Sequence, residues 1–197
     1  GIQFYDGITT DEIQEILIKS ASDLISLDQP NYQFVAARLL LFSIRKSLYG
    51  KIFEIPHLKD HIDRCVESGV YDPAVNDKFT AGEINEIEKF LDHDRDYLFT
   101  YAGLRQVADK YLVQDRSSGQ VYETPQFMYM LIAMTMFAEY DRGTRLNYIK
   151  RYYDAISRHK INIPTPIMGG VRTPIRQFAS CVLVDIDDTL DSIFTSD

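Results

Sequence analysis

The sequence predicts a mainly α-helical chain that turns to short strands only near its C-terminal end. Apolar residues at helical spacing, set off by capping residues, recur from residue 10 to about residue 158. The character then changes, because prolines, a glycine pair and two β-rich runs crowd into residues 161–186. Two short strands are not stable alone, so we expect them to join a sheet or barrel that other strands complete.

A hairpin of two amphipathic helices is predicted over residues 10–49. Thr9 can cap the first helix, and Pro30 prevents it from continuing because proline lacks a backbone donor. The second helix is expected to run to Tyr49, with Gly50 providing the left-handed residue that often ends a helix.

Five further helices follow. They are expected from Pro56, from Thr80, over residues 101–111, from Thr124 and over residues 144–158. Thr80 and Glu83 have the spacing of a capping box, and Thr124 precedes a proline at the first helical position. Residues 127–140 are apolar nearly all round, which predicts a buried helix.

Composition narrows the function classes. The net charge of −8 disfavours general binding to nucleic acid, which depends on basic surfaces. Two distant cysteines, Cys65 and Cys181, predict neither a disulfide scaffold nor a zinc site. We see no signal peptide and no apolar run long enough to cross a bilayer, so we expect a cytoplasmic protein without a membrane partner.

No self-sufficient catalytic motif is present, such as a phosphate loop or a metal-binding helix. His57 and His61 could share a helix face, but such a pair is more often solvated surface than a metal site, and we predict no metal. The charged run from Asp92 to Asp96 could be an acid–base cluster, although we favour a salt network at a helix end.

The stretch from Pro164 to Leu183 carries the most specific motifs, Pro-Thr-Pro-Ile-Met and Ser-Cys. It resembles the first barrel strands of the large subunit of aerobic, class I ribonucleotide reductases. Essentially the whole chain is similar; the other matching segments are 5–7, 36–38, 93–96, 112–114 and 122–127.

The resemblance implies roles for three residues of this stretch. Cys181 matches a redox-active cysteine that reduces the ribose and forms a disulfide with a second cysteine farther along the barrel. Thr165 and Ser180 match contacts to the bound nucleoside diphosphate. Without the motif, Cys181 would more often be a small buried hydrophobe and Thr165 plain strand; the motif favours the functional interpretation.

Allosteric sites are also implied. Asp188, Thr189 and Leu190 match the start of a helix at the dimer interface that binds the deoxynucleotide effector, although Asp188 could equally be a plain helix cap. Thr10 and Lys46 match contacts to the activity effector, ATP or dATP, in a helical ATP-cone. Here Gln14 stands where the family often has histidine, and the nucleotide-binding strands of that module are not matched.

The resemblance therefore predicts three regions: the C-terminal part of an ATP-cone at 1–50, a helical region at 51–160, and at 161–197 the first strands of a ten-stranded α/β barrel with the start of the effector helix. The implied activity is reduction of ribonucleoside diphosphates by thiyl-radical chemistry, and the chain itself is expected to bind no cofactor.

The implied partners begin with the remainder of the large subunit, in cis or as a separate chain, because the radical cysteine and the second reducing cysteine are not matched here. The others are a second large subunit, a small subunit with a metal/tyrosyl-radical cofactor, and thioredoxin or glutaredoxin. Two alternatives stay open: a non-catalytic nucleotide sensor, and a helical scaffold in which Cys181 is inert.

Overall fold

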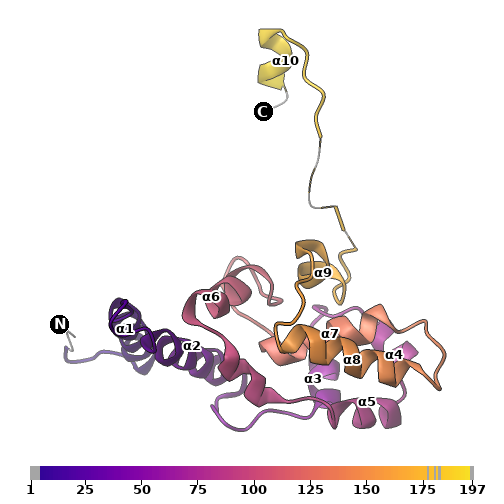
Figure 1. Ribbon diagram of the computed structural model, residues 1–197, viewed down its shortest axis with the longest axis horizontal. Coiled ribbons are helices and arrows are strands. Elements are labelled where there is room, and N and C mark those ends of the chain that lie inside the picture. Colours follow the sequence, from indigo (N-terminus) through magenta and orange to yellow (C-terminus); the bar gives the residue numbers. More distant parts are fainter. Residues whose placement is uncertain (1–4, 177, 180, 182, 196–197) are drawn as a thin grey trace.

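The computed structural model describes residues 5–176, 178–179, 181 and 183–195, and within these ranges it contains helices and no strands. An isolated antiparallel bridge joins Gln114 to Val121. The helices are α1 (Thr10–Asp23), α2 (Tyr32–Tyr49), α3 (Leu58–Glu67), α4 (Ala74–Lys78), α5 (Ala81–Glu88), the 3-10 helix η1 (His93–Leu98), α6 (Tyr101–Lys110), α7 (Pro125–Met136), α8 (Arg145–Ser157), α9 (Thr165–Gly170) and α10 (Leu190–Thr195) (Figure 1).

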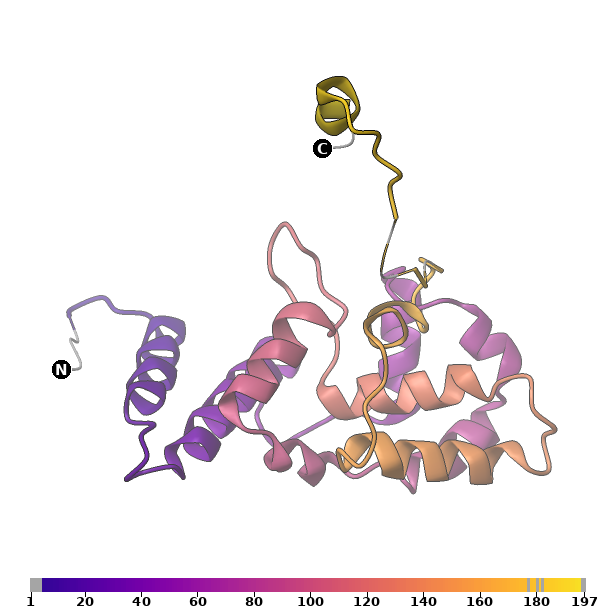
Figure 2. The same cartoon turned by 45° about the horizontal axis from the view of Figure 1, so that its top comes forward.

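Helices α1 and α2 form the predicted hairpin. Thr9 and Glu12 make a reciprocal capping box at the start of α1, which satisfies amide groups that have no partner within the helix. Gly50 ends α2 with φ of 71°, a left-handed conformation that glycine adopts without a Cβ clash. The hairpin projects from the rest of the molecule, and α2 joins it to the body by packing against α6 and η1 (Figure 2).

Helix α7 is the centre of the helical body, as its apolar composition predicted. Residues 125–134 are all buried, and α7 packs against α8, α9 and η1. Thr124 precedes Pro125 as expected, but its hydroxyl makes no capping hydrogen bond. The capping box at Thr80 and Glu83 is present at the start of α5. The sequence pattern thus located the core helix and the main helix starts correctly.

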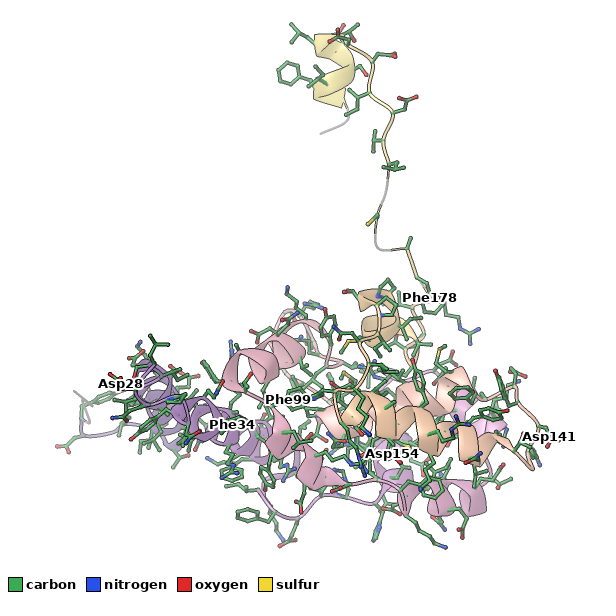
Figure 3. All side chains as sticks on the ribbon, viewed as in Figure 1. Asp28, Phe34, Phe99, Asp141, Asp154 and Phe178 are labelled. Atoms are coloured by element: carbon green, nitrogen blue, oxygen red, sulfur yellow. The ribbon has the colours of Figure 1, made fainter. Side chains whose placement is uncertain are left out.

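The C-terminal region differs from the expectation of strands. Residues 161–164 are irregular, and Thr165 begins the short helix α9, in which Pro166 occupies the first turn. This position suits proline because the first amides of a helix have no intrahelical partner. The described residues between Phe178 and Asp187 are in neither helix nor strand and lead away from the body to α10 (Figures 1 and 3). A strand needs a neighbour for its hydrogen bonds, and no described segment provides one here.

Two further expectations from the sequence concern the helix near the C-terminal end and membrane-spanning helices. A helix does begin at Leu190, where the effector helix was predicted. None of the described helices is both long and apolar enough to span a membrane.

Candidate functional site

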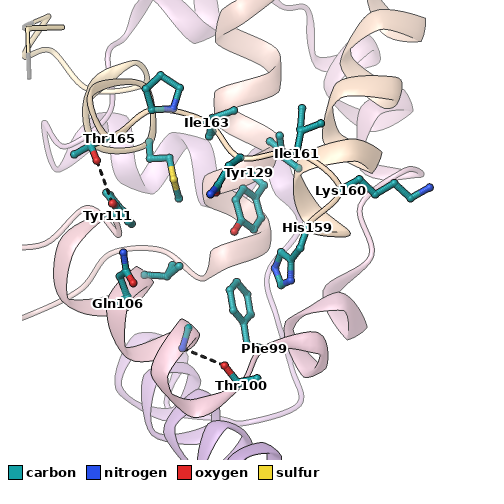
Figure 4. Close-up of a pocket in the computed structure, with 16 residues that line it drawn as sticks. Phe99, Thr100, Gln106, Tyr111, Tyr129, His159, Lys160, Ile161, Ile163 and Thr165 are labelled. Atoms are coloured by element: carbon teal, nitrogen blue, oxygen red, sulfur yellow. Dashed lines mark hydrogen bonds between the residues drawn. The ribbon is translucent and has the colours of Figure 1, made fainter.

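A cavity of about 610 Å³ lies where one side of α6, the helix α7, the end of α8 and the segment leading into α9 meet. Aromatic rings and polar groups face it together, among them Phe99, Gln106, Tyr129, His159 and Thr165 (Figure 4). A lining of this mixed kind suits a ligand with both a flat ring and hydrogen-bonding groups.

Thr165 lies at one side of this cavity and touches a residue from another helix. Its Oγ1 is 3.2 Å from the hydroxyl oxygen of Tyr111, the residue that follows α6 (Figure 4). His159 lies at the opposite side of the cavity, and its ring centroid is 4.6 Å from that of Phe99. The backbone of His159 is left-handed, with φ of 55°, and partial burial lowers the pKa of its ring.

A buried ion pair lies beneath the Thr165 end of the cavity. The side chains of Arg172 and Glu123 are 1% and 0% exposed, and Arg172 Nε donates to both carboxylate oxygens of Glu123 at 3.1 and 2.9 Å. Burial alone would lower the pKa of Arg172, but the adjacent Glu123 carboxylate raises it. The guanidinium group and the carboxylate satisfy each other's hydrogen-bonding groups inside the protein.

The carboxylate of Glu123 extends the network towards α3. It accepts hydrogen bonds from the Val113 amide, at 2.8 Å, and from the Tyr71 hydroxyl. Tyr71 in turn contacts His61 Nε2 at 2.9 Å, and burial followed by the nearby Glu123 raises the pKa of Tyr71 well above its usual value. His61 stacks on Phe127 of α7, with ring centroids 3.9 Å apart.

This arrangement corrects the prediction for the histidine pair. His57 is exposed and pairs with Glu88, but His61 is fully buried, and burial lowers its pKa well below the usual value. The helix face that carries His61 packs onto α7, which the local sequence of α3 did not indicate. Within the described residues, no group of three or more possible ligands is placed to hold a metal ion.

The predicted salt network at residues 92–96 is confirmed. Asp96 is buried and pairs with Arg45 of α2 at 3.1 Å, and its other oxygen accepts from Gln126 at 3.0 Å. Burial raises the pKa of Asp96 to about 6, against the opposing effect of Arg45. Arg95 pairs with Asp92 at 3.2 Å. The network joins the N-terminal hairpin to η1 and α7.

Thr10 and Lys46, predicted as one nucleotide site, lie together. Lys46 Nζ is 3.2 Å from Thr10 Oγ1 and 3.1 Å from a carboxylate oxygen of Asp11. Gln14 lies on the same helix and donates to the backbone oxygen of Leu39 at 2.9 Å. The ammonium group of Lys46 is thus engaged by both Thr10 and Asp11.

Of the three residues predicted to act at the substrate, Thr165 lines the cavity, whereas Cys181 does not. Cys181 is exposed on the segment that leads away from the body, and it does not line this cavity. Ser180 lies outside the described residues. Asp188, Thr189 and Leu190 are exposed, and the Thr189 hydroxyl accepts from the Ser192 amide at 3.2 Å, which caps α10.

Comparison with known proteins identifies the chain. Residues 97–176 match the model of the ribonucleotide reductase all-alpha domain. Over 192 residues the chain is 54% identical to ribonucleoside-diphosphate reductase 1 subunit alpha of Escherichia coli (strain K12), a match that covers 98% of this chain and 25% of the relative. Residues 97–176 belong to the ribonucleotide reductase all-alpha domain, and nearly the whole chain is similar to one quarter of a reductase alpha subunit.

More distant members of the family match the same extent. The alpha subunit of Enterobacteria phage T4 is 48% identical over 188 residues, covering 95% of this chain and 25% of that protein. The alpha subunit of Helicobacter pylori (strain ATCC 700392 / 26695) is 33% identical over 195 residues, covering 99% and 24%. The chain thus spans about a quarter of the length of its relatives.

The matched range, 97–176, contains every residue that lines the cavity, and it also contains Glu123 and Arg172 of the buried ion pair. Of Tyr111, Glu123, Thr165 and Arg172, only Thr165 was predicted from the sequence as a site residue. An arginine within a Pro/Gly-rich stretch, 49 residues from its carboxylate partner, gives no local signal of burial.

Proposed function

We propose that this chain is the N-terminal part of a ribonucleoside-diphosphate reductase alpha subunit. Together with the remainder of that subunit and the small radical-generating subunit, it reduces ribonucleoside diphosphates to deoxyribonucleoside diphosphates for DNA synthesis in the cytoplasm. The observation that carries this proposal is 54% identity over 98% of the chain to a protein of that name.

The reducing thiol of this chain is Cys181. In the proposed reaction, Cys181 and a cysteine of the remaining large subunit give up two electrons and form a disulfide. The ribose loses its 2′-hydroxyl as water, and thioredoxin or glutaredoxin later reduces the disulfide. Thr165 and Ser180 contact the diphosphate, and the radical originates from the metal/tyrosyl-radical cofactor of the small subunit.

The proposal requires residues 161–197 to be completed as barrel strands by the rest of the subunit. An exposed, extended segment supports this requirement, since Leu183 is 99% exposed and a side chain of that kind gains stability from burial. The expected division into an ATP-cone part at 1–50 and a helical region at 51–160 belongs to the same proposal, as does dimerisation of the large subunit through α10.

Two nucleotide effectors are included in the proposal. A deoxynucleotide that selects the substrate base binds at Asp188, Thr189 and Leu190 beside the start of α10. ATP or dATP binds at Thr10 and Lys46, where the ammonium group would exchange its contact with Asp11 for a phosphate oxygen.

The test is a reduction assay with a nucleoside diphosphate substrate. This chain is combined with the remaining large subunit, fused or separate, together with the small subunit and a reductant. Steady formation of deoxynucleotide that is lost in Cys181→Ser is expected. Activity that survives Cys181→Ser would instead favour the scaffold alternative, and tight dATP binding without any turnover would favour the nucleotide sensor.

A further inference from the structure

We propose that Tyr111, held in place by the buried Arg172–Glu123 pair, is a positioning residue that orients the Thr165 hydroxyl towards a phosphate oxygen of the bound nucleoside diphosphate. This inference rests on the proposed function, in which Thr165 contacts that substrate. It adds Tyr111, which touches Thr165, and the ion pair that holds the backbone on both sides of this contact.

The contact between the two hydroxyls joins distant parts of the chain. Tyr111 follows the last residue of α6 and Thr165 is the first residue of α9, and their oxygens are 3.2 Å apart at the edge of the cavity (Figure 4). Both residues also line that cavity. A ligand that reaches Thr165 therefore meets a hydroxyl whose orientation is already set by a neighbour.

One guanidinium group fixes the backbone on both sides of this contact. Arg172 Nη2 donates to the backbone oxygen of Tyr111 at 2.8 Å, and Arg172 Nη1 donates to the backbone oxygen of Met168, in α9, at 2.5 Å. Because Glu123 holds the same guanidinium from the other side, neither α9 nor the end of α6 can shift without breaking a buried, charge-assisted hydrogen bond.

The acidity of the two hydroxyl groups indicates whether Tyr111 or Thr165 donates the hydrogen bond between them. A hydroxyl group has one proton to donate and two lone pairs to accept with. Either hydroxyl could donate in this contact. A phenol is the stronger donor of the two, so in the proposed arrangement Tyr111 donates to Thr165 Oγ1. The Thr165 proton is then free for an acceptor, and the oxygens of an anionic phosphate group accept hydrogen bonds.

Removing the Tyr111 hydroxyl should therefore weaken substrate binding through Thr165. In the assembled reductase, Tyr111→Phe is expected to raise the KM for the nucleoside diphosphate about three- to tenfold with kcat within about twofold, as for the loss of one hydrogen bond. In a Thr165→Ala background the same substitution should change KM by less than about twofold. Tyr140→Phe removes a hydroxyl from an exposed tyrosine outside the cavity and is the matched control.

The outcomes separate this inference from the proposed function. If Thr165→Ala raises KM but Tyr111→Phe does not, or if Tyr111→Phe acts equally in both backgrounds, Tyr111 does not position Thr165. If Thr165→Ala leaves KM unchanged in an active enzyme, the substrate contact itself is wrong. If the wild-type assembly produces no deoxynucleotide, the proposed function fails first. Unchanged melting temperatures for Tyr111→Phe and Tyr140→Phe would exclude a general loss of stability as the cause.

Discussion

Replacing Arg172 by methionine should lower the free energy of unfolding of this chain by about 3–5 kcal/mol, the range for removing one partner of a buried ion pair. Arg172 donates to Glu123 and to the backbone oxygens of Tyr111 and Met168. Methionine fills much of the same volume but donates nothing. The Glu123 carboxylate would stay buried with the Val113 amide and the Tyr71 hydroxyl as its remaining donors, and two backbone oxygens would lose a partner.

The effect can be measured by urea unfolding followed by helical circular dichroism. For a chain of this size each kcal/mol corresponds to about 2–4 °C, so the melting temperature should fall by roughly 6–20 °C. Arg176→Met is the matched control, because Arg176 pairs with Asp72 at 2.5 Å but its side chain is 67% exposed. An exposed pair contributes about 0–1 kcal/mol. A loss of less than about 1 kcal/mol in the free energy of unfolding of Arg172→Met would contradict this prediction, and so would an equal loss in both variants.

Two further predictions concern stability. Burial, aided by Arg45, lowers the pKa of His93 to about 4 from 6.5. Between these values the unfolded chain binds the proton more tightly, so this contribution to stability is complete above pH 6.5 and is lost as pH falls towards 4. Asp96, whose pKa burial raises to about 6, acts in the opposite direction in every variant. His93→Gln should therefore lose less stability than wild type between pH 7 and pH 5 in urea titrations; parallel losses would contradict this. Thr80→Ala removes the capping hydroxyl of α5 and should cost about 0.5–2 kcal/mol in the same assay, and a variant as stable as wild type would argue against the capping box.

The helical hairpin and the core helix could be predicted because their determinants are local. A capping residue, a proline or a glycine acts within one turn of its own position, as Thr9 and Gly50 do here. The burial of α7 followed from its composition alone, since a helix that is apolar on every side has no face for water.

The features that were missed depend on contacts between distant segments. His61 is buried where its ring stacks on Phe127, and Arg172 is buried where it pairs with Glu123. Both partners lie far away in the sequence. Thr165 was predicted from its motif. Its contact with Tyr111 could not be predicted, because it depends on how the end of α6 meets the start of α9 in the fold. The expected strands need neighbouring strands to accept and donate their backbone hydrogen bonds, and the described residues contain none. Local β-propensity alone was therefore not enough to form them.

The redox state of Cys181 after one catalytic cycle tests the central claim most directly. The assembled reductase, reduced and then freed of external reductant, is given one equivalent of nucleoside diphosphate, and the Cys181 thiol is quantified by mass spectrometry. We expect Cys181 to enter a disulfide with a cysteine of the remaining large subunit, with one deoxynucleotide formed per disulfide. Deoxynucleotide formed while Cys181 stays a thiol would contradict it.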